Sequence, residues 1–138
     1  MGDIADGEPM SNPNKRRGDD AERKLAAYLQ TRGWPDAERA LGAGRHDDRG
    51  DIHNAGQIVW ECKSYKTIDL PGFLRELARE KANARVSTGA VVVKRRGSTD
   101  PANWYAVLEL ADFTALLNEA GYGDVTPTTT IPKKKEAS

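Results

Sequence analysis

The sequence has a single cysteine, Cys62, among its 138 residues, which excludes an internal disulfide framework and a cysteine-rich zinc module. It lacks any apolar run near the roughly 20 residues that a membrane-spanning helix needs. Its first residues are acidic and polar rather than basic and then apolar, which is not the pattern of a signal peptide. These absences favour a protein of the reducing cytoplasm with no membrane partner.

An excess of one charge is also absent, since 21 lysines and arginines balance 21 aspartates and glutamates. This balance excludes a histone-like protein that coats nucleic acid by bulk positive charge, so any DNA binding must be local. No Walker motif or complete dinucleotide fingerprint is present, and no nucleotide cofactor is expected. With 38% hydrophobic and 30% charged residues, the composition is that of one globular domain.

Residues 1–17 and 123–138 show no hydrophobic periodicity and are predicted to be disordered tails, each with a short basic run, around one domain over 18–122. Within that domain the hydrophobic pattern predicts helices over 19–32, 69–85 and 112–120, and strands over 36–42, 50–53, 58–63, 89–94 and 104–110. The second and third strands are expected to form a hairpin. This αβββαββα order predicts an α/β fold with a mixed central sheet flanked by helices.

The helix over 69–85 and the strand after it should form a βαβ unit with the strand over 58–63, because the unbroken apolar run at 89–94 is typical of a buried parallel strand. The inward face of this helix is predicted to hold Leu70, Leu74, Leu77, Ala78 and Ala82. Its charged residues are expected on a solvated face, where Glu76 and Glu80 pair with Arg75 and Arg79. The last helix is expected to turn Phe113, Leu116 and Leu117 inward.

Two carboxylates and a lysine stand out on the expected hairpin. Alternation along a strand places Glu61 and Lys63 on one face, and a three-residue hairpin loop would put Asp51 opposite Glu61, with side-chain origins about 5 Å apart. Carboxylates this close repel each other unless a cation lies between them, and an all-oxygen site suits Mg²⁺ or Mn²⁺. The alternative, a cross-strand surface salt bridge, is equally compatible with the spacing alone.

A third carboxylate, Glu22, lies at the edge of the inward face of the first helix, three residues before Leu25. It is a candidate to join the other two. The alternative is that Glu22 caps its own helix, because it follows Asp19 by three residues in a capping-box-like pattern.

Four blocks of sequence carry a family resemblance. Asp51, nine intervening residues and Glu61-Cys62-Lys63 resemble the signature of the PD-(D/E)xK nuclease superfamily, with Gly50 in place of its proline. Together with the helix that carries Glu22 and with Glu38-Arg39, they are similar to the Holliday junction resolvases of archaea and their phage-encoded relatives. The resemblance covers roughly residues 15–110 and implies a restriction-endonuclease-like fold.

The resemblance also implies a role for each matched residue. Asp51 and Glu61, together with Glu22 and the backbone carbonyl of Cys62, would bind Mg²⁺, for which Mn²⁺ could substitute. Lys63 would assist the attacking water, so the expected catalytic residues are Glu22, Asp51, Glu61 and Lys63.

The same resemblance assigns Arg39 to a DNA phosphate, and Arg23 more weakly. Three further DNA-binding candidates come from the residues themselves: Arg45 in a glycine-rich loop, and Lys66 and Lys94 beside other basic side chains. Pairing of Arg39 with Asp36 or Glu38 is the alternative for that residue.

The expected function is therefore a Mg²⁺-dependent, structure-selective endodeoxyribonuclease that resolves four-way junctions during DNA recombination. Cutting two strands at two-fold related positions with one site per chain implies a homodimer. The alternatives are another PD-(D/E)xK nuclease, of repair or restriction type, and a non-catalytic DNA-binding protein on the same scaffold.

Overall fold

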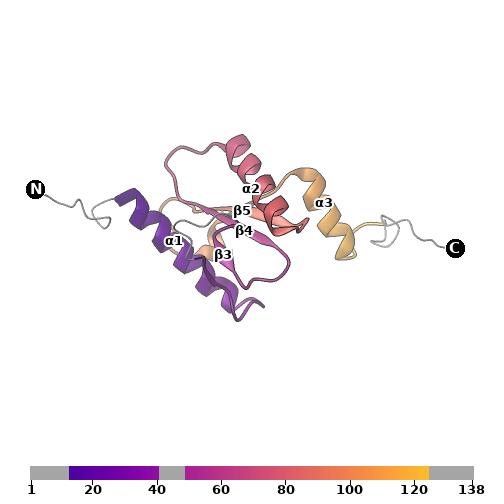
Figure 1. Ribbon diagram of the computed structural model, residues 1–138, viewed down its shortest axis with the longest axis horizontal. Coiled ribbons are helices and arrows are strands. Elements are labelled where there is room, and N and C mark those ends of the chain that lie inside the picture. Colours follow the sequence, from indigo (N-terminus) through magenta and orange to yellow (C-terminus); the bar gives the residue numbers. More distant parts are fainter. Residues whose placement is uncertain (1–12, 41–48, 125–138) are drawn as a thin grey trace, which may run out of the picture. The chain divides into compact units, whose positions relative to one another are not determined.

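The computed structural model describes residues 13–40 and 49–124 as a mixed α/β protein (Figure 1). The helices are α1 (Pro13–Gln30), α2 (Leu70–Ala84) and α3 (Leu110–Glu119), with a short 3₁₀ turn at Pro101–Asn103. The strands are β2 (Glu38–Arg39), β3 (Ile52–His53), β4 (Val59–Lys63), β5 (Gly89–Val93) and β6 (Tyr105–Val107). The chain forms two compact units that divide between Val107 and Leu108.

Helix α1 begins at Pro13, six residues before the predicted start. Proline is well tolerated at the first position of a helix, and the lysine and arginines that follow it are good helix formers, so the helix extends through Gly18. Residues 13–17, which the sequence pattern assigned to the N-terminal tail, are therefore helical. Asp19 and Glu22 lie inside the helix rather than at its start, so the capping-box interpretation of Glu22 was wrong.

Strands β4, β5 and β6 form a three-stranded sheet in which β4 and β5 are parallel and β5 and β6 are antiparallel. Lys63, Val93 and Tyr105 stand side by side across its three strands. The parallel pair and the helix that joins it confirm the predicted βαβ unit. Asp69 caps α2 by accepting a hydrogen bond from the Gly72 N–H, and Arg85 ends the helix in a left-handed conformation.

The predicted hairpin does not form as a ladder, because β3 pairs with β2 in a separate antiparallel sheet. A backbone hydrogen bond from Asp51 N to the oxygen of Trp60, at 2.8 Å, links this segment to β4. The next donor on β4, the N–H of Cys62, is bound by the Asp51 side chain instead of a backbone carbonyl. The side chain thus replaces the strand partner that a continued hairpin would have supplied.

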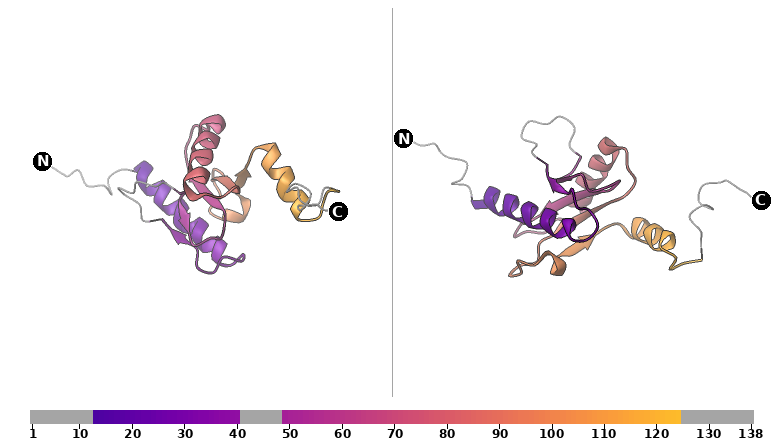
Figure 2. Two further views of the ribbon diagram at one scale, coloured as in Figure 1. Left: turned by 45° about the vertical axis from the view of Figure 1, so that its right-hand side comes forward. Right: turned by 90° about the horizontal axis from the view of Figure 1, so that it is seen from below.

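Helices α1 and α2 pack on opposite faces of β4 and β5 (Figure 2). On the α1 face, Trp60, Cys62 and Val92 contact a cluster that includes Leu25 and Leu29. The α2 face forms a second cluster of Val59, Val91, Val93, Phe73 and Leu77. This alternation along β4 decides which helix each functional side chain meets.

The inward face of α2 differs from the predicted one. Its buried residues are Phe73, Leu77 and Glu80, whereas Leu70 is 40% exposed and Ala78 and Ala82 are exposed. Steps of four and three residues follow the helical period, so this stripe is the one that covers the valines of β4 and β5. Of the predicted set, Leu77 is buried and Leu74 packs against the same cluster, so the prediction was right for these two. The inward face also includes the carboxyl group of Glu80.

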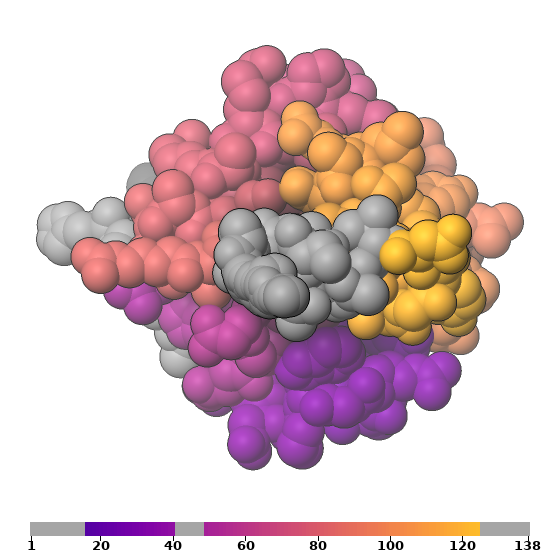
Figure 3. Space-filling view, turned by 90° about the vertical axis from the view of Figure 1, so that its right-hand side faces the viewer, coloured from indigo at the N-terminus to yellow at the C-terminus, as the bar shows by residue number. Residues whose placement is uncertain are grey.

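The second unit contains helix α3. Helix α3 has no buried residue and its side chains form part of the surface in the space-filling view (Figure 3). Phe113, predicted to face inward, is 46% exposed, while Leu116 and Leu117 are half-buried. Within the part of the chain that the structure describes, no helix is both long and apolar enough to cross a membrane.

Candidate functional site

Asp51 makes three hydrogen bonds, and two of them hold it against the edge of β4. Its backbone N–H donates to Trp60 and its carbonyl accepts from Ala40, each at 2.8 Å. Its carboxylate Oδ2 accepts the N–H of Cys62 at 2.7 Å. The carboxylate is thus fixed at the residue that separates Glu61 from Lys63.

Gly50 makes this close approach possible. Its φ is +102°, and a Cβ placed on it would lie 2.8 Å from Val59 Cγ1 and 2.9 Å from the oxygen of Trp60. A side chain would therefore push the Asp51 segment away from β4. Gly50 therefore has a direct structural reason in this fold.

Glu61 and Lys63 lie on the α2 face of β4 and are both buried, as the strand alternation predicted. Lys63 Nζ contacts Glu61 Oε2 at 2.9 Å and Glu76 Oε1, from α2, at 2.7 Å. Burial alone would lower the pKa of Lys63, but the two carboxylates outweigh it and raise the pKa above its usual value. The ammonium therefore stays charged, held between a strand and a helix.

Glu80 brings a further carboxyl group to Glu61. One oxygen each from Glu61, Glu76 and Glu80 lie within 4.8 Å of one another, so these three residues could hold a metal ion. Burial, and then the neighbouring Glu80, raise the pKa of Glu61 to about 9, against the opposing effect of Lys63. The cluster favours a proton or a cation between its acids, because negative charges at this separation repel each other in a buried site.

The Asp51 carboxyl has a raised pKa for similar reasons. Burial is the largest cause and the charge of Glu61 the next, and together they bring the pKa to about 8 against the Cys62 N–H, which lowers it. Burial and the charge of Asp51 also raise the pKa of the Cys62 thiol, which therefore stays protonated at neutral pH.

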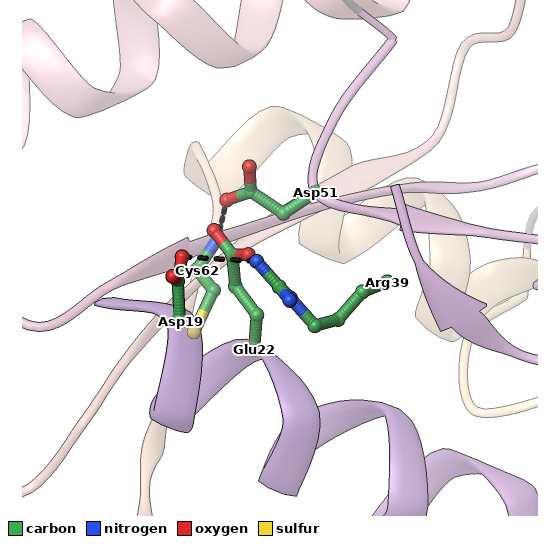
Figure 4. A network of polar contacts seen from close by, with 5 residues as sticks. All are labelled: Asp19, Glu22, Arg39, Asp51 and Cys62. Carbon is green, nitrogen blue, oxygen red and sulfur yellow. Dashed lines mark hydrogen bonds and ion pairs between the residues drawn. The ribbon is translucent and has the colours of Figure 1, made fainter. Parts of the chain in front are cut away.

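Glu22 belongs to a network on the other side of β4. Arg39 donates from Nε to Glu22 Oε1 at 3.1 Å and from Nη2 to Asp19 Oδ1 at 2.9 Å, both acids coming from α1 (Figure 4). The alternative partners considered for Arg39, Asp36 and Glu38, are not the ones it binds. Arg39 thus joins the first helix to β2.

The sheet separates these acids because α1 packs on the face of Cys62 and α2 on the face of Glu61. Asp51 lies at the edge between them, and the charges of both Glu61 and Glu22 raise its pKa. In the described part of the chain, the acids close enough to share one ion are Glu61, Glu76 and Glu80, so Glu22, Asp51 and Glu61 do not form such a group. The acids therefore form one group on the α1 face of β4 and another on the α2 face, with Asp51 between the two groups.

Glu76 and Glu80 are functional candidates that the sequence reading missed. The sequence pattern predicted that both glutamates lie on a solvated face beside Arg75 and Arg79. In the structure, Glu76 binds Lys63 and Glu80 is fully buried. A signal was present, since Glu80 follows Phe73 by seven residues and Leu77 by three, which is the spacing of one helix face. A glutamate on that face needs a partner in the core, and Lys63 of β4 and its neighbour Glu61 lie there.

The five residues expected to bind DNA lie in different parts of the structure. Lys66 and Lys94 line the same cleft, at the carboxyl ends of β4 and β5, whereas Arg23 lies exposed on α1. Arg39 is engaged with α1, and Arg45 lies outside the described residues. The structure therefore brings together two of the five.

Comparison of the chain with protein-family models, with curated proteins and with solved structures found no match.

Proposed function

We propose that this chain is a metal-dependent endodeoxyribonuclease of the PD-(D/E)xK type, with four-way DNA junctions as its substrate. One observation carries the proposal: the Asp51 carboxylate is bound to the N–H of Cys62, between Glu61 and Lys63. The order of one helix, three strands, a helix and two strands supports a restriction-endonuclease-like fold. Gly50, which allows Asp51 to reach β4, supports the same assignment.

The acids of the site suit a hard cation such as Mg²⁺, since they offer only oxygen ligands. Glu61 belongs both to the expected set, with Asp51, Glu22 and the Cys62 carbonyl, and to the cluster with Glu76 and Glu80. It is therefore the residue whose loss would remove the cation under either arrangement. When bound, the cation would polarise a phosphate and lower the pKa of a water molecule.

Lys63 is the other reacting group in this proposal. Its raised pKa keeps it protonated, so it would orient water or steady the negative charge that grows on the phosphate, rather than accept a proton. To do so its ammonium must leave Glu76 for the substrate, while Glu61 keeps it on the same face of β4. Glu76 thus holds the lysine in place when no phosphate is present.

A gel assay of four-way, Y-shaped and linear duplex DNA, with Mg²⁺ or with EDTA, tests the proposal. We expect Mg²⁺-dependent paired nicks at the four-way branch, no cleavage by Glu61→Gln, and normal cleavage by the control Glu119→Gln, which alters an exposed acid of α3. Sedimentation should show a dimer, because two matched cuts require two sites. A monomer, or equal cleavage of linear duplex, would favour a repair or restriction type of nuclease instead.

A non-catalytic DNA-binding protein is the second candidate. The enclosure of Lys63 favours this second candidate, because the Lys63 side chain is only 7% exposed and its ammonium contacts two carboxylates. In that case Mg²⁺ would produce no cleavage of any of the three DNAs, and Glu61→Gln would bind junctions as the wild type does.

A further inference from the structure

A cleft of about 740 Å³ lies at the carboxyl ends of β4 and β5, and we call it the carboxyl-edge cleft. Its volume falls in the range of roughly 300–1,000 Å³ that is usual for ligand sites. Its lining includes two exposed aromatic rings, exposed apolar side chains such as Ile68 and Leu70, and a group of basic side chains. The rings and basic residues used below are Tyr65, Tyr105, Lys66, Lys94, Arg95 and Arg96. No aspartate or glutamate is among the described residues that line it, so its charge complements an anionic ligand.

The two tyrosines are set at opposite sides of this edge. Tyr105 is on β6 beside Val93, and Val93 is beside Lys63 on β4, so Tyr105 and Lys63 stand two strand spacings, or about 10 Å, apart. Tyr65 follows Lys63 by two residues. Both rings are more than half exposed, at 59% for Tyr65 and 54% for Tyr105. Exposed rings that line a basic cleft are suited to stacking rather than to core packing.

The Tyr65 ring is held in place by its neighbours. It packs on Phe73 with ring centroids 5.8 Å apart, and the Lys63 ammonium lies 5.6 Å from its centroid. A ring fixed in this way loses little freedom when a ligand stacks on its open side. The same contact places Tyr65, a lining residue of the cleft, directly beside Lys63 of the candidate site.

We propose that the carboxyl-edge cleft binds a single strand of DNA, with unpaired bases stacked on Tyr65 and Tyr105 and phosphates bound by the surrounding lysines and arginines. A base in a duplex hides its faces from a protein ring, whereas an unpaired base exposes them. The choice of DNA rests on the proposed nuclease function. The proposal adds to that function a subsite for unpaired nucleotides beside Lys63, one that needs neither metal nor cleavage.

The test measures binding of the full-length protein to fluorescein-labelled dT15 and to a 15-base-pair duplex, by anisotropy in EDTA. Tyr65→Ala and Tyr105→Ala should each weaken dT15 binding by roughly 5- to 150-fold, the usual range for one base–aromatic stack, and leave duplex binding unchanged. Tyr65→Phe and Tyr105→Phe keep the ring and should bind dT15 as the wild type does. The matched control is Tyr122→Ala, which removes a tyrosine that is 82% exposed in the other unit.

A second measurement separates stacking from charge. Lys94→Gln should reduce the slope of log affinity against log salt for dT15 by about 0.7, the contribution of one phosphate contact on a single strand. Unchanged dT15 affinity in both tyrosine-to-alanine variants would overturn the proposal, as would an equal loss of duplex binding. Junction cleavage that persists while dT15 binding is absent would overturn this inference alone, and the reverse result would overturn only the nuclease.

Discussion

Replacement of Asp51 by asparagine should make protein stability less sensitive to pH. The fold raises the pKa of this carboxyl from 3.8 to about 8, chiefly through burial and then through the charge of Glu61. Asparagine keeps a side-chain oxygen that can accept the N–H of Cys62, so the hydrogen bond at 2.7 Å is retained while the charge is removed. The variant therefore isolates the effect of ionisation.

The magnitude follows from proton counting. Between pH 5 and 7 the unfolded Asp51 carboxyl has lost its proton and the folded one still holds it, so wild-type stability falls as pH rises. One proton corresponds to about 1.36 kcal/mol per pH unit, or about 2.7 kcal/mol over this window. The asparagine side chain does not titrate, so Asp51→Asn should gain about 2.7 kcal/mol relative to wild type from pH 5 to pH 7.

Urea unfolding in EDTA, followed by tryptophan fluorescence at pH 5 and pH 7, measures this difference. The three tryptophans, Trp34, Trp60 and Trp104, all lie in the unit that contains Asp51, so their signal reports its unfolding. The matched control Asp36→Asn alters an exposed carboxyl and should change stability by less than about 0.5 kcal/mol at either pH. An Asp51→Asn advantage that is equal at both pH values would refute the argument that the fold desolvates this carboxylate.

Three further predictions address the cation, the lysine and the glycine. Mg²⁺ at 100 times its Kd should stabilise the wild type by about 2.7 kcal/mol in urea unfolding and should not stabilise Glu61→Gln. This stabilisation should be larger at pH 8 than at pH 6, because protons compete with the ion for the same acids. Equal stabilisation of both proteins would place the ion elsewhere. Lys63→Ala should slow junction cleavage by roughly 10²-fold or more in single-turnover assays, the usual scale for one positioned catalytic group, and a normal rate would reduce Lys63 to an ion-pair partner. Gly50→Ala should destabilise the fold by about 2 kcal/mol or more, since its Cβ would meet Val59 at 2.8 Å; an unchanged urea midpoint would contradict the close approach of Asp51 to β4.

Local sequence patterns predicted the elements well where the apolar pattern is strong. The run over 89–94 predicted β5, and the helix predicted over 69–85 corresponds to α2, which Asp69 and Arg85 bracket. Alternation also placed Glu61 and Lys63 on one face, which the structure confirms. These features depend on backbone period and on near neighbours, so they can be read from a short stretch of chain.

Contacts between side chains from distant parts of the sequence could not be predicted from such local patterns. The sequence specified that Glu61 and Lys63 share a face, but only the packing of α2 on that face decided that Glu76 and Glu80 would meet them. Glu22 is on the predicted helix, yet α1 packs on the opposite face of β4 and gives Glu22 to Arg39. Either face of a buried strand can accept a helix, so the face of β4 on which each helix packs is decided only in the assembled core. This packing separated Glu22 from Glu61, which spacing alone had grouped.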